Sequence, residues 1–302
     1  MSMAFIACVE HGNLENQAVL LFRSIRKYAG KYKNAPIYSF QPRNGTPLKA
    51  DTLKAFEELG IVHSTEKLNA EFHYYPRANK IFACARAEAV SRQDILVFLD
   101  SDTVVMNEPE SFELPNGVVA AVRPVDNKNE GSAGIDDLND EYWRKMYLIC
   151  GVPETPFVES VVDRKRIRSY WNSGLVVMRR SEGLFQQWRD NFIKLMQAKH
   201  APGGRLAFVE QLSLSPTLAK VADKIKILDY RYNYPLPKRS LLVEPYRSAE
   251  FEDLIHIHYH RWFNKPGFLE MLMPSLNRHS EIYKWISSFL PFQPTIDEPL
   301  RF

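Results

Sequence analysis

The chain has 302 residues, of which 45% are hydrophobic and 25% are charged, a composition that is ordinary for globular proteins and excludes a disordered tail or a fibre. Its formal net charge of +3 is too small for the concentrated positive field of nucleic-acid-binding proteins, so we expect no nucleic-acid partner. The three cysteines, Cys8, Cys84 and Cys150, are odd in number and widely spaced. We interpret them as buried thiols of a reducing, cytoplasmic compartment.

Short apolar segments alternate with helical patterns over about the first hundred residues. Strands are predicted at residues 4–9, 36–40, 61–64 and 95–99, and helices up to residue 28, at 49–59 and at 78–91. This alternation indicates βαβ units, and therefore an α/β fold with a mostly parallel central sheet and helices on both faces. The run ILVFL at residues 95–99 is uninterrupted, which is typical of a strand in the middle of such a sheet.

The second half of the chain begins with a predicted strand at residues 117–124, followed by a polar segment, a helix that contains tryptophan, and a basic run at 164–168. We interpret residues 126–168 as a mobile insertion, whose basic run either binds an anion or is a solvated loop. Regular structure is predicted to resume with a strand at 173–180, helices at 182–199 and 207–222, and a strand at 225–228. We expect one domain, residues 1–267, and a C-terminal tail, residues 268–302, that packs on it.

No run approaches the roughly 18 apolar residues that cross a bilayer, so we expect at most peripheral membrane contact. The candidate segment is IYKWISSFLPF at residues 282–292. The same pattern is typical of a terminal helix that packs on the body of a protein.

Two carboxylates, Asp100 and Asp102, follow the strand at 95–99 in the sequence FLDSDTVV. In an open parallel sheet the ligand crevice lies beyond the carboxyl ends of the strands, which places Asp100, Ser101 and Asp102 at the ligand edge. Side chains at positions i and i+2 point the same way, so the pair suits one hard cation such as Mg²⁺ or Mn²⁺. Aspartate pairs are also common in turns at strand ends, so the pair alone names no function.

A second cluster is the sequence HIHYH, in which His256, His258 and His260 alternate with other residues. A strand period of two would place all three imidazoles on one face. Such a face favours a metal or phosphate role as strongly as a structural one. Nitrogen ligands beside two carboxylates would favour manganese over magnesium.

Four motifs together resemble the retaining glycosyltransferases of the glycogenin and lipopolysaccharide-galactosyltransferase type, which have the A-type (GT-A, Rossmann-like) fold. The motifs are DSD at Asp100, WNSG at Trp171, EQ at Glu210 and HYHRWFNKP at His258. The resemblance covers roughly residues 4–267. It implies metal-dependent transfer of a sugar from a nucleotide-diphosphate sugar, with retention of configuration. A UDP-sugar is favoured over a GDP-sugar, although no motif near the first strand separates uridine from guanosine. The acceptor would be the hydroxyl of a saccharide, a lipid-linked sugar or a small molecule, recognised largely by residues 126–168.

The resemblance also implies roles for individual residues. Asp100, Asp102 and His258 would hold Mn²⁺ or Mg²⁺, with His256 and His260 as alternatives for the third ligand. The residues at the reacting sugar would be Asn172, Glu210 and Gln211. The residues that hold the donor would be Lys80, with Arg86 as its alternative, Ser101, Gly174, Lys265, and Cys8 and Val9 at the end of the first strand.

Other functions share parts of this pattern. FLDSDTVV also fits the first motif of haloacid-dehalogenase-type phosphatases, in which Asp100 would be a phosphorylated nucleophile. That motif normally ends the first strand of its fold, whereas here about ninety residues of βαβ pattern precede it. A sugar-nucleotide-forming nucleotidyltransferase would need a glycine-rich loop after the first strand, where this chain has one glycine. A nucleotide-sugar-binding protein without turnover is the remaining alternative.

Overall fold

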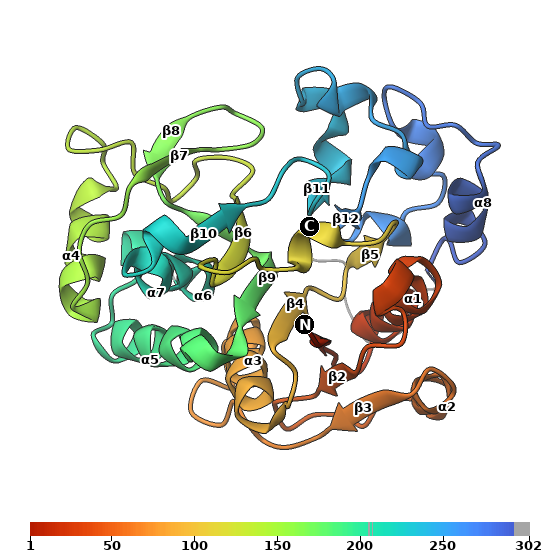
Figure 1. The fold of residues 1–302 in the computed structure, drawn as a ribbon, viewed down its shortest axis with the longest axis horizontal. Helices are drawn as coiled ribbons and strands as arrows, with labels where there is room; N and C mark the ends of the chain where they lie inside the picture. The colour runs from red at the N-terminus through yellow and green to blue at the C-terminus, as the bar shows by residue number, and fades with distance from the viewer. Residues whose placement is uncertain (205, 207, 293–302) are drawn as a thin grey trace.

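The computed structural model describes residues 1–204, 206 and 208–292. Its centre is a seven-stranded sheet in the order β10-β6-β9-β4-β1-β2-β3 (Figure 1). All of these strands run in one direction except β9, which is antiparallel to both β4 and β6. The prediction of a mostly parallel sheet is therefore confirmed, and the apolar strand β4 is central. The strands are β1 Met3–Cys8, β2 Ile37–Phe40, β3 Ile61–Ser64, β4 Ile95–Leu99, β6 Ala120–Pro124, β9 Trp171–Arg179 and β10 Ile225–Ile227.

Two groups of helices cover the two faces of the sheet. Alternate residues of β4 point to opposite faces, so that Leu96 and Phe98 join one hydrophobic cluster while Ile95 and Val97 join another. The first face is covered by α3 Asn79–Val90, α4 Asp140–Cys150, α5 Leu184–Gln197 and two short helices, α6 Val209–Leu212 and α7 Leu214–Ala219. The second face is covered by α1 Asn13–Tyr28 and α2 Ala50–Glu58. The expected helices on both faces are thus confirmed.

The prediction of one continuous helix at residues 207–222 is wrong. The chain forms the separate helices α6 and α7, which meet at Ser213. Pro216 has no amide hydrogen to donate to Leu212, so a continuous helix would lack a bond there. The predicted start at Ala207 lies outside the described residues.

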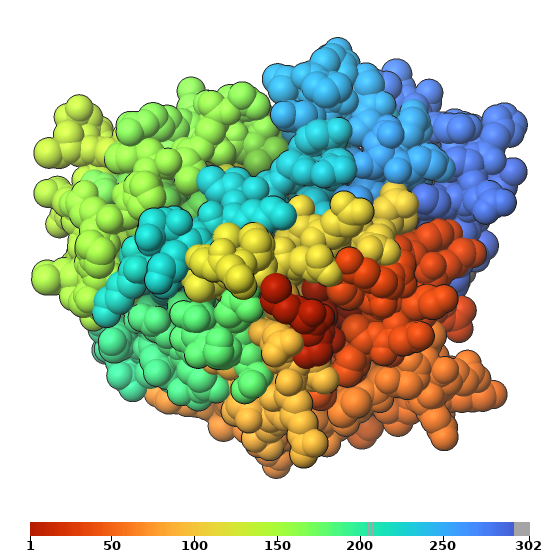
Figure 2. Space-filling model, viewed as in Figure 1, coloured from red at the N-terminus to blue at the C-terminus, as the bar shows by residue number. Residues whose placement is uncertain are grey.

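The C-terminal segment forms a third hydrophobic cluster against α1 and the short strand β5 Thr103–Val105. Leu269 and Ile286 are buried there together with Leu20 of α1 and Val104, and the space-filling view shows the C-terminal and N-terminal segments in contact (Figure 2). The helix α8 Glu281–Ser287 packs into this cluster, as expected for a terminal helix. The small sheet beside it contains β11 Tyr234–Pro235, β12 His256–His258 and β5 Thr103–Val105. Residues 293–302 of the predicted tail lie outside the described part.

No helix within the described residues is both long enough and apolar enough to cross a membrane. The three cysteines are free, with Cys84 and Cys150 buried and Cys8 partly exposed.

The segment predicted as an insertion contains α4 and a hairpin made of β7 Phe157–Glu159 and β8 Arg166–Arg168. Nε of Arg168 lies 2.7 Å from Oδ1 of Asp140, and both side chains are buried. Nε of Arg164 lies 2.6 Å from Oε1 of Glu159. Two arginines of the basic run therefore pair with acids of the insertion itself.

Candidate active site

The turn after β4 lies beside the first residues of β9. Because β9 runs antiparallel to β4, its start meets the end of β4, and the amide of Asp100 donates to the carbonyl of Gly174 at 2.8 Å. A Cβ atom added to Gly174 would lie 2.9 Å from Oδ2 of Asp100, 3.0 Å from Cε1 of His258 and 3.1 Å from Oδ1 of Asn172. Three side chains from separate motifs thus converge on a space that only glycine leaves open.

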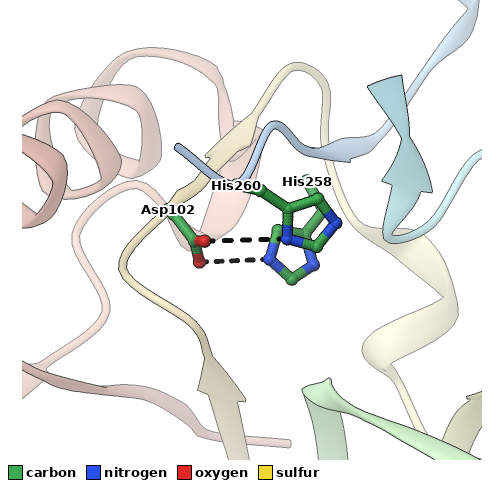
Figure 3. A group of neighbouring side chains, drawn as sticks. All are labelled: Asp102, His258 and His260. Carbon is green, nitrogen blue, oxygen red and sulfur yellow. Dashed lines mark hydrogen bonds and ion pairs between the residues drawn. The ribbon is translucent and has the colours of Figure 1, made fainter. Parts of the chain in front are cut away.

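Asp102, His258 and His260 form a cluster whose possible ligand atoms all lie within 4.8 Å of one another (Figure 3). Nε2 of His258 is 3.1 Å from Oδ1 of Asp102, and Nδ1 of His260 is 3.8 Å from Oδ2. The pairing of β12 with β5 brings them together, because His258 lies opposite Thr103. A carboxylate and two imidazoles in this arrangement suit a divalent transition-metal ion.

His256 does not join this cluster. It lies opposite Val105, further along β5 from Asp102, and its Nδ1 accepts a hydrogen bond from the amide of Asn233 at 3.2 Å. Burial lowers the pKa of the His256 imidazole well below its usual value. The strand ends at His258, and His260 has a φ of 53°. The prediction of one extended strand that carries all three histidines is therefore wrong, because the left-handed residue breaks the pleat.

The charges of Asp102 and His258 favour each other, whereas His260 is held neutral. Burial alone would lower the pKa of His258, but Asp102 and Asp100 outweigh it and raise that pKa. Burial alone would raise the pKa of Asp102, but the two neighbouring imidazoles and Lys80 lower it. For His260, burial and the charge of His258 lower the pKa to about 4. The Asp102 carboxylate is therefore ionised at neutral pH and available to a cation.

Lys80 of α3 is the basic residue that reaches the acidic turn, residues 100–102 after β4. Its Nζ lies 2.7 Å from Oδ1 of Asp100 and also donates to the carbonyl of Ser173 at 3.4 Å. Burial would lower the pKa of Lys80, but Asp100 and Glu210 outweigh burial and raise it. Arg86 of the same helix instead pairs with Glu66, 2.7 Å away, and both side chains are exposed.

The Glu210 and Gln211 pair lies at the start of α6, beside the first residues of β9. Oε1 of Gln211 accepts from the amide of Ser173 at 3.2 Å, and its Nε2 donates to the hydroxyl of Tyr170 at 2.9 Å. The buried carboxylate of Glu210 accepts a hydrogen bond from the hydroxyl of Tyr75. Burial raises the pKa of Glu210, and the nearby Lys80 opposes this only in part. Both side chains are therefore held in place.

The remaining predicted residues differ in their surroundings. The hydroxyl of Ser101 donates to the carbonyl of Cys8, so these two lie together at the end of β1. Val9 is fully buried in the core, and its amide donates to Phe40 at 2.9 Å. Lys265 is exposed, and its ammonium lies 5.3 Å from the ring centroid of Trp262. Within the described part of the chain, it makes no ion pair with the acidic residues after β4.

Three residues that contact this site do not stand out in the sequence. Tyr75, Tyr170 and Asn233 each bind a side chain that is distant along the chain, and 135 positions separate Tyr75 from Glu210. No short motif or spacing marks such pairs. Asn233 has a φ of 51°, a conformation that asparagine tolerates, but a single asparagine before Tyr234 and Pro235 is not distinctive.

Comparison with known proteins assigns the chain to a family. Residues 5–222 match the Rhodobacterales glycosyltransferase domain, whereas no curated protein matches the sequence. The galactosyltransferase LgtC, solved with donor and acceptor sugar analogs, is similar in structure with a TM-score of 0.50 and 12% identity, over 97% of this chain and 98% of that chain. The bifunctional glycosyltransferase WbbM in its apo form gives a TM-score of 0.48 and 14% identity over 96% of this chain, which spans only 52% of the WbbM chain.

The likeness to LgtC concerns the fold, and the fold is the GT-A-like α/β architecture expected from the sequence. The family match covers most of the chain, including the acidic turn, the start of β9 and the Glu210 and Gln211 pair. The β12 histidines lie beyond the matched residues. The chain belongs to the Rhodobacterales glycosyltransferase domain family, and it is a glycosyltransferase.

Proposed function

We propose that this enzyme transfers a sugar from a nucleoside-diphosphate sugar to an acceptor hydroxyl, with a divalent cation held by Asp100, Asp102 and His258. The observation that carries the proposal is the convergence at Gly174, where Asp100 and His258 approach the same point to within 2.9 and 3.0 Å. Asp102, from the same motif as Asp100, also approaches this imidazole, with its Oδ1 3.1 Å from Nε2 of His258. Carboxylate oxygens and an imidazole nitrogen are a donor set that Mn²⁺ accepts more readily than Mg²⁺.

A bound cation would supply charge neutralisation for the departing nucleoside diphosphate. Lys80 adds a second positive charge at the same place, since its ammonium lies 2.7 Å from Asp100. A preorganised cationic site of this kind lowers the barrier because the leaving phosphate gains charge in the transition state. We assign to Lys80 the donor role that the sequence left open between it and Arg86.

The sugar would lie against the first residues of β9. Asn172 and Gln211 present amide groups there, and Gln211 is fixed by Ser173 and Tyr170. Glu210 lies beside this pair, where its charge would stabilise a developing oxocarbenium-like centre. The acceptor hydroxyl would then attack from the face of the leaving group, which retains the configuration.

The donor and the acceptor would be recognised by different segments of the chain. We assign recognition of the donor, a UDP-sugar in preference to a GDP-sugar, to the end of β1, where Cys8 meets Ser101. We assign the acceptor, a sugar, lipid-linked or small-molecule hydroxyl, to residues 126–168. Thr155 and Phe157 of that segment line a cavity of about 230 Å³ together with Trp171.

The test is release of nucleoside diphosphate from a panel of UDP- and GDP-sugars, with Mn²⁺, with Mg²⁺ or with EDTA. We expect turnover of a UDP-sugar that EDTA abolishes and that Asp102→Ala reduces by at least about a hundredfold. Asp223→Ala, which changes an exposed aspartate outside the proposed donor, metal and acceptor residues, is the matched control. NMR of the product anomer reports the stereochemistry. Turnover that survives both EDTA and Asp102→Ala would exclude the metal-dependent mechanism.

A further inference from the structure

We propose that His260 is an additional protein ligand of the cation, so that this site offers two imidazoles and selects Mn²⁺ over Mg²⁺. The inference rests on the proposed metal dependence and extends it. The sequence resemblance implies one histidine as the third ligand, whereas this chain places two beside the same carboxylate.

The two imidazoles approach different oxygens of Asp102. Nε2 of His258 lies 3.1 Å from Oδ1, and Nδ1 of His260 lies 3.8 Å from Oδ2. Figure 3 shows both rings on the same side of the Asp102 carboxylate. Their rings overlap with centroids 3.9 Å apart and planes inclined by 39°. Around one octahedral ion, adjacent ligand atoms are about 3 Å apart and opposite ones about 4 Å apart. The spacing of these atoms therefore suits a single ion with only small side-chain shifts.

The backbone conformation of His260 ends the strand direction and redirects its side chain. Its φ of 53° is in the left-handed region, which histidine adopts more readily than most residues other than glycine. The side chain is 41% exposed, so it does not belong to the hydrophobic core.

The neighbouring residue fixes the direction of this turn. Tyr259 is fully buried, its ring stacks on Phe263 with centroids 3.7 Å apart, and its amide donates to the carbonyl of Asp102 at 3.1 Å. The chain is thus anchored on the core immediately before His260 and turns the next imidazole back toward the Asp102 carboxylate.

A second imidazole changes which ion the site prefers. Mg²⁺ favours oxygen ligands and keeps its water shell, whereas Mn²⁺ accepts nitrogen as well as oxygen. A site with two imidazoles should therefore bind Mn²⁺ well and Mg²⁺ poorly. Loss of one imidazole should reduce the affinity for Mn²⁺ far more than the affinity for Mg²⁺.

The experiment counts imidazole nitrogens on Mn²⁺ bound to the purified chain, by electron spin-echo envelope modulation. We expect two coupled imidazoles in the wild type and one in His260→Asn, because asparagine tolerates the left-handed backbone but carries no ring. Mn²⁺ titration should show about tenfold weaker binding in the variant, with Mg²⁺ affinity changed less than twofold. His279→Asn, at an exposed histidine outside the cluster, is the matched control.

Two other outcomes are distinguishable. A single coupled imidazole in the wild type that persists in His260→Asn would overturn the role of His260 and leave the proposed metal dependence intact. Failure of the folded wild type to bind Mn²⁺, with or without UDP, would overturn the metal dependence itself and this inference with it.

Discussion

The side-chain oxygen of Asn233 lies 3.1 Å from Nδ1 of His258, and the backbone amide of the same asparagine lies 3.2 Å from Nδ1 of His256. One fully buried residue thus fixes the rings of both strand histidines. Because an amide oxygen can only accept, Nδ1 of His258 carries the hydrogen and Nε2 is turned toward Asp102. Partners of this kind orient the imidazole ligands of metal sites.

Asn233→Ala should therefore weaken Mn²⁺ binding by about 10- to 100-fold, because the His258 ring loses its orientation. The measurement is Mn²⁺ titration of the folded variant. Asn129→Ala is a matched control, because Asn129 also has a left-handed φ, 41° against 51° for Asn233, but does not contact a histidine of the site. Equal affinities in the two variants would show that Asn233 does not position His258.

Gly174→Ala should impair the site without unfolding the chain. The added methyl group would lie 2.9 Å from Oδ2 of Asp100 and 3.0 Å from Cε1 of His258, so both side chains must move apart. We expect metal affinity and turnover to fall at least about tenfold, since ligand geometry is displaced by a few tenths of an ångström or more. Gly45→Ala is the control, because its methyl group would meet only Gln41, at 3.8 Å. Unchanged Mn²⁺ affinity in Gly174→Ala would contradict a site at this glycine.

Much of this architecture follows from local sequence pattern. The strands β1 to β4 and the helices between them have clear periodicity, and the acidic turn lies at the sheet edge because the apolar run before it forms the central strand. The convergence of Asp100, Asn172 and Gly174 is predictable only in outline. It depends on β9 running antiparallel to β4, and the sequence of a buried strand does not reveal its direction.

The histidine cluster shows where local pattern fails. Alternation in HIHYH predicts three imidazoles on one face, but only His256 and His258 lie in the strand. Register with β5 decides which of them meets Asp102, and a backbone turn adds His260. Both features depend on contacts with residues more than a hundred positions away, which composition and spacing do not encode.

Tyr75→Phe tests the role assigned to Glu210. The variant removes the hydroxyl that donates to the buried carboxylate, and this hydrogen bond lowers the pKa of Glu210 against the effect of burial. Its loss should raise that pKa further, so the carboxylate becomes protonated at a higher pH. We expect the acid limb of the kcat profile to move to higher pH, while KM for the donor changes little. Tyr74→Phe, at an exposed neighbouring tyrosine, should leave the profile unchanged. An unshifted acid limb in Tyr75→Phe would indicate that ionised Glu210 is not needed for turnover.

Asp126→Asn should reduce stability in a pH-dependent way. Burial would raise the pKa of Asp126, but Nη2 of Arg123 and Nζ of Lys238, the latter 3.1 Å away, outweigh it and lower the pKa to about 2. Because the folded pKa lies below that of the unfolded chain, the ionised carboxylate stabilises the fold above pH 4, and this stabilisation is lost as the pH falls toward 2. From the size of the shift, we expect Asp126→Asn to lower the free energy of unfolding by about 2 kcal/mol at pH 7 and by about half as much near pH 3.

Urea denaturation of wild type and Asp126→Asn at several pH values measures this difference. Asp136→Asn serves as the control, because Asp136 lies in the same segment, residues 126–168, but is exposed, and it should change stability by less than about 0.5 kcal/mol at any pH. Asp126 also contributes to the raised pKa of His258, so its carboxylate belongs to the electrostatic surroundings of the proposed metal site. If the stability difference stayed constant between pH 7 and pH 3, the effect of the variant would come from altered packing. A difference that shrinks with acid would instead identify the ion pairs with Arg123 and Lys238 as its cause, because protonation of the wild-type carboxylate then mimics the substitution.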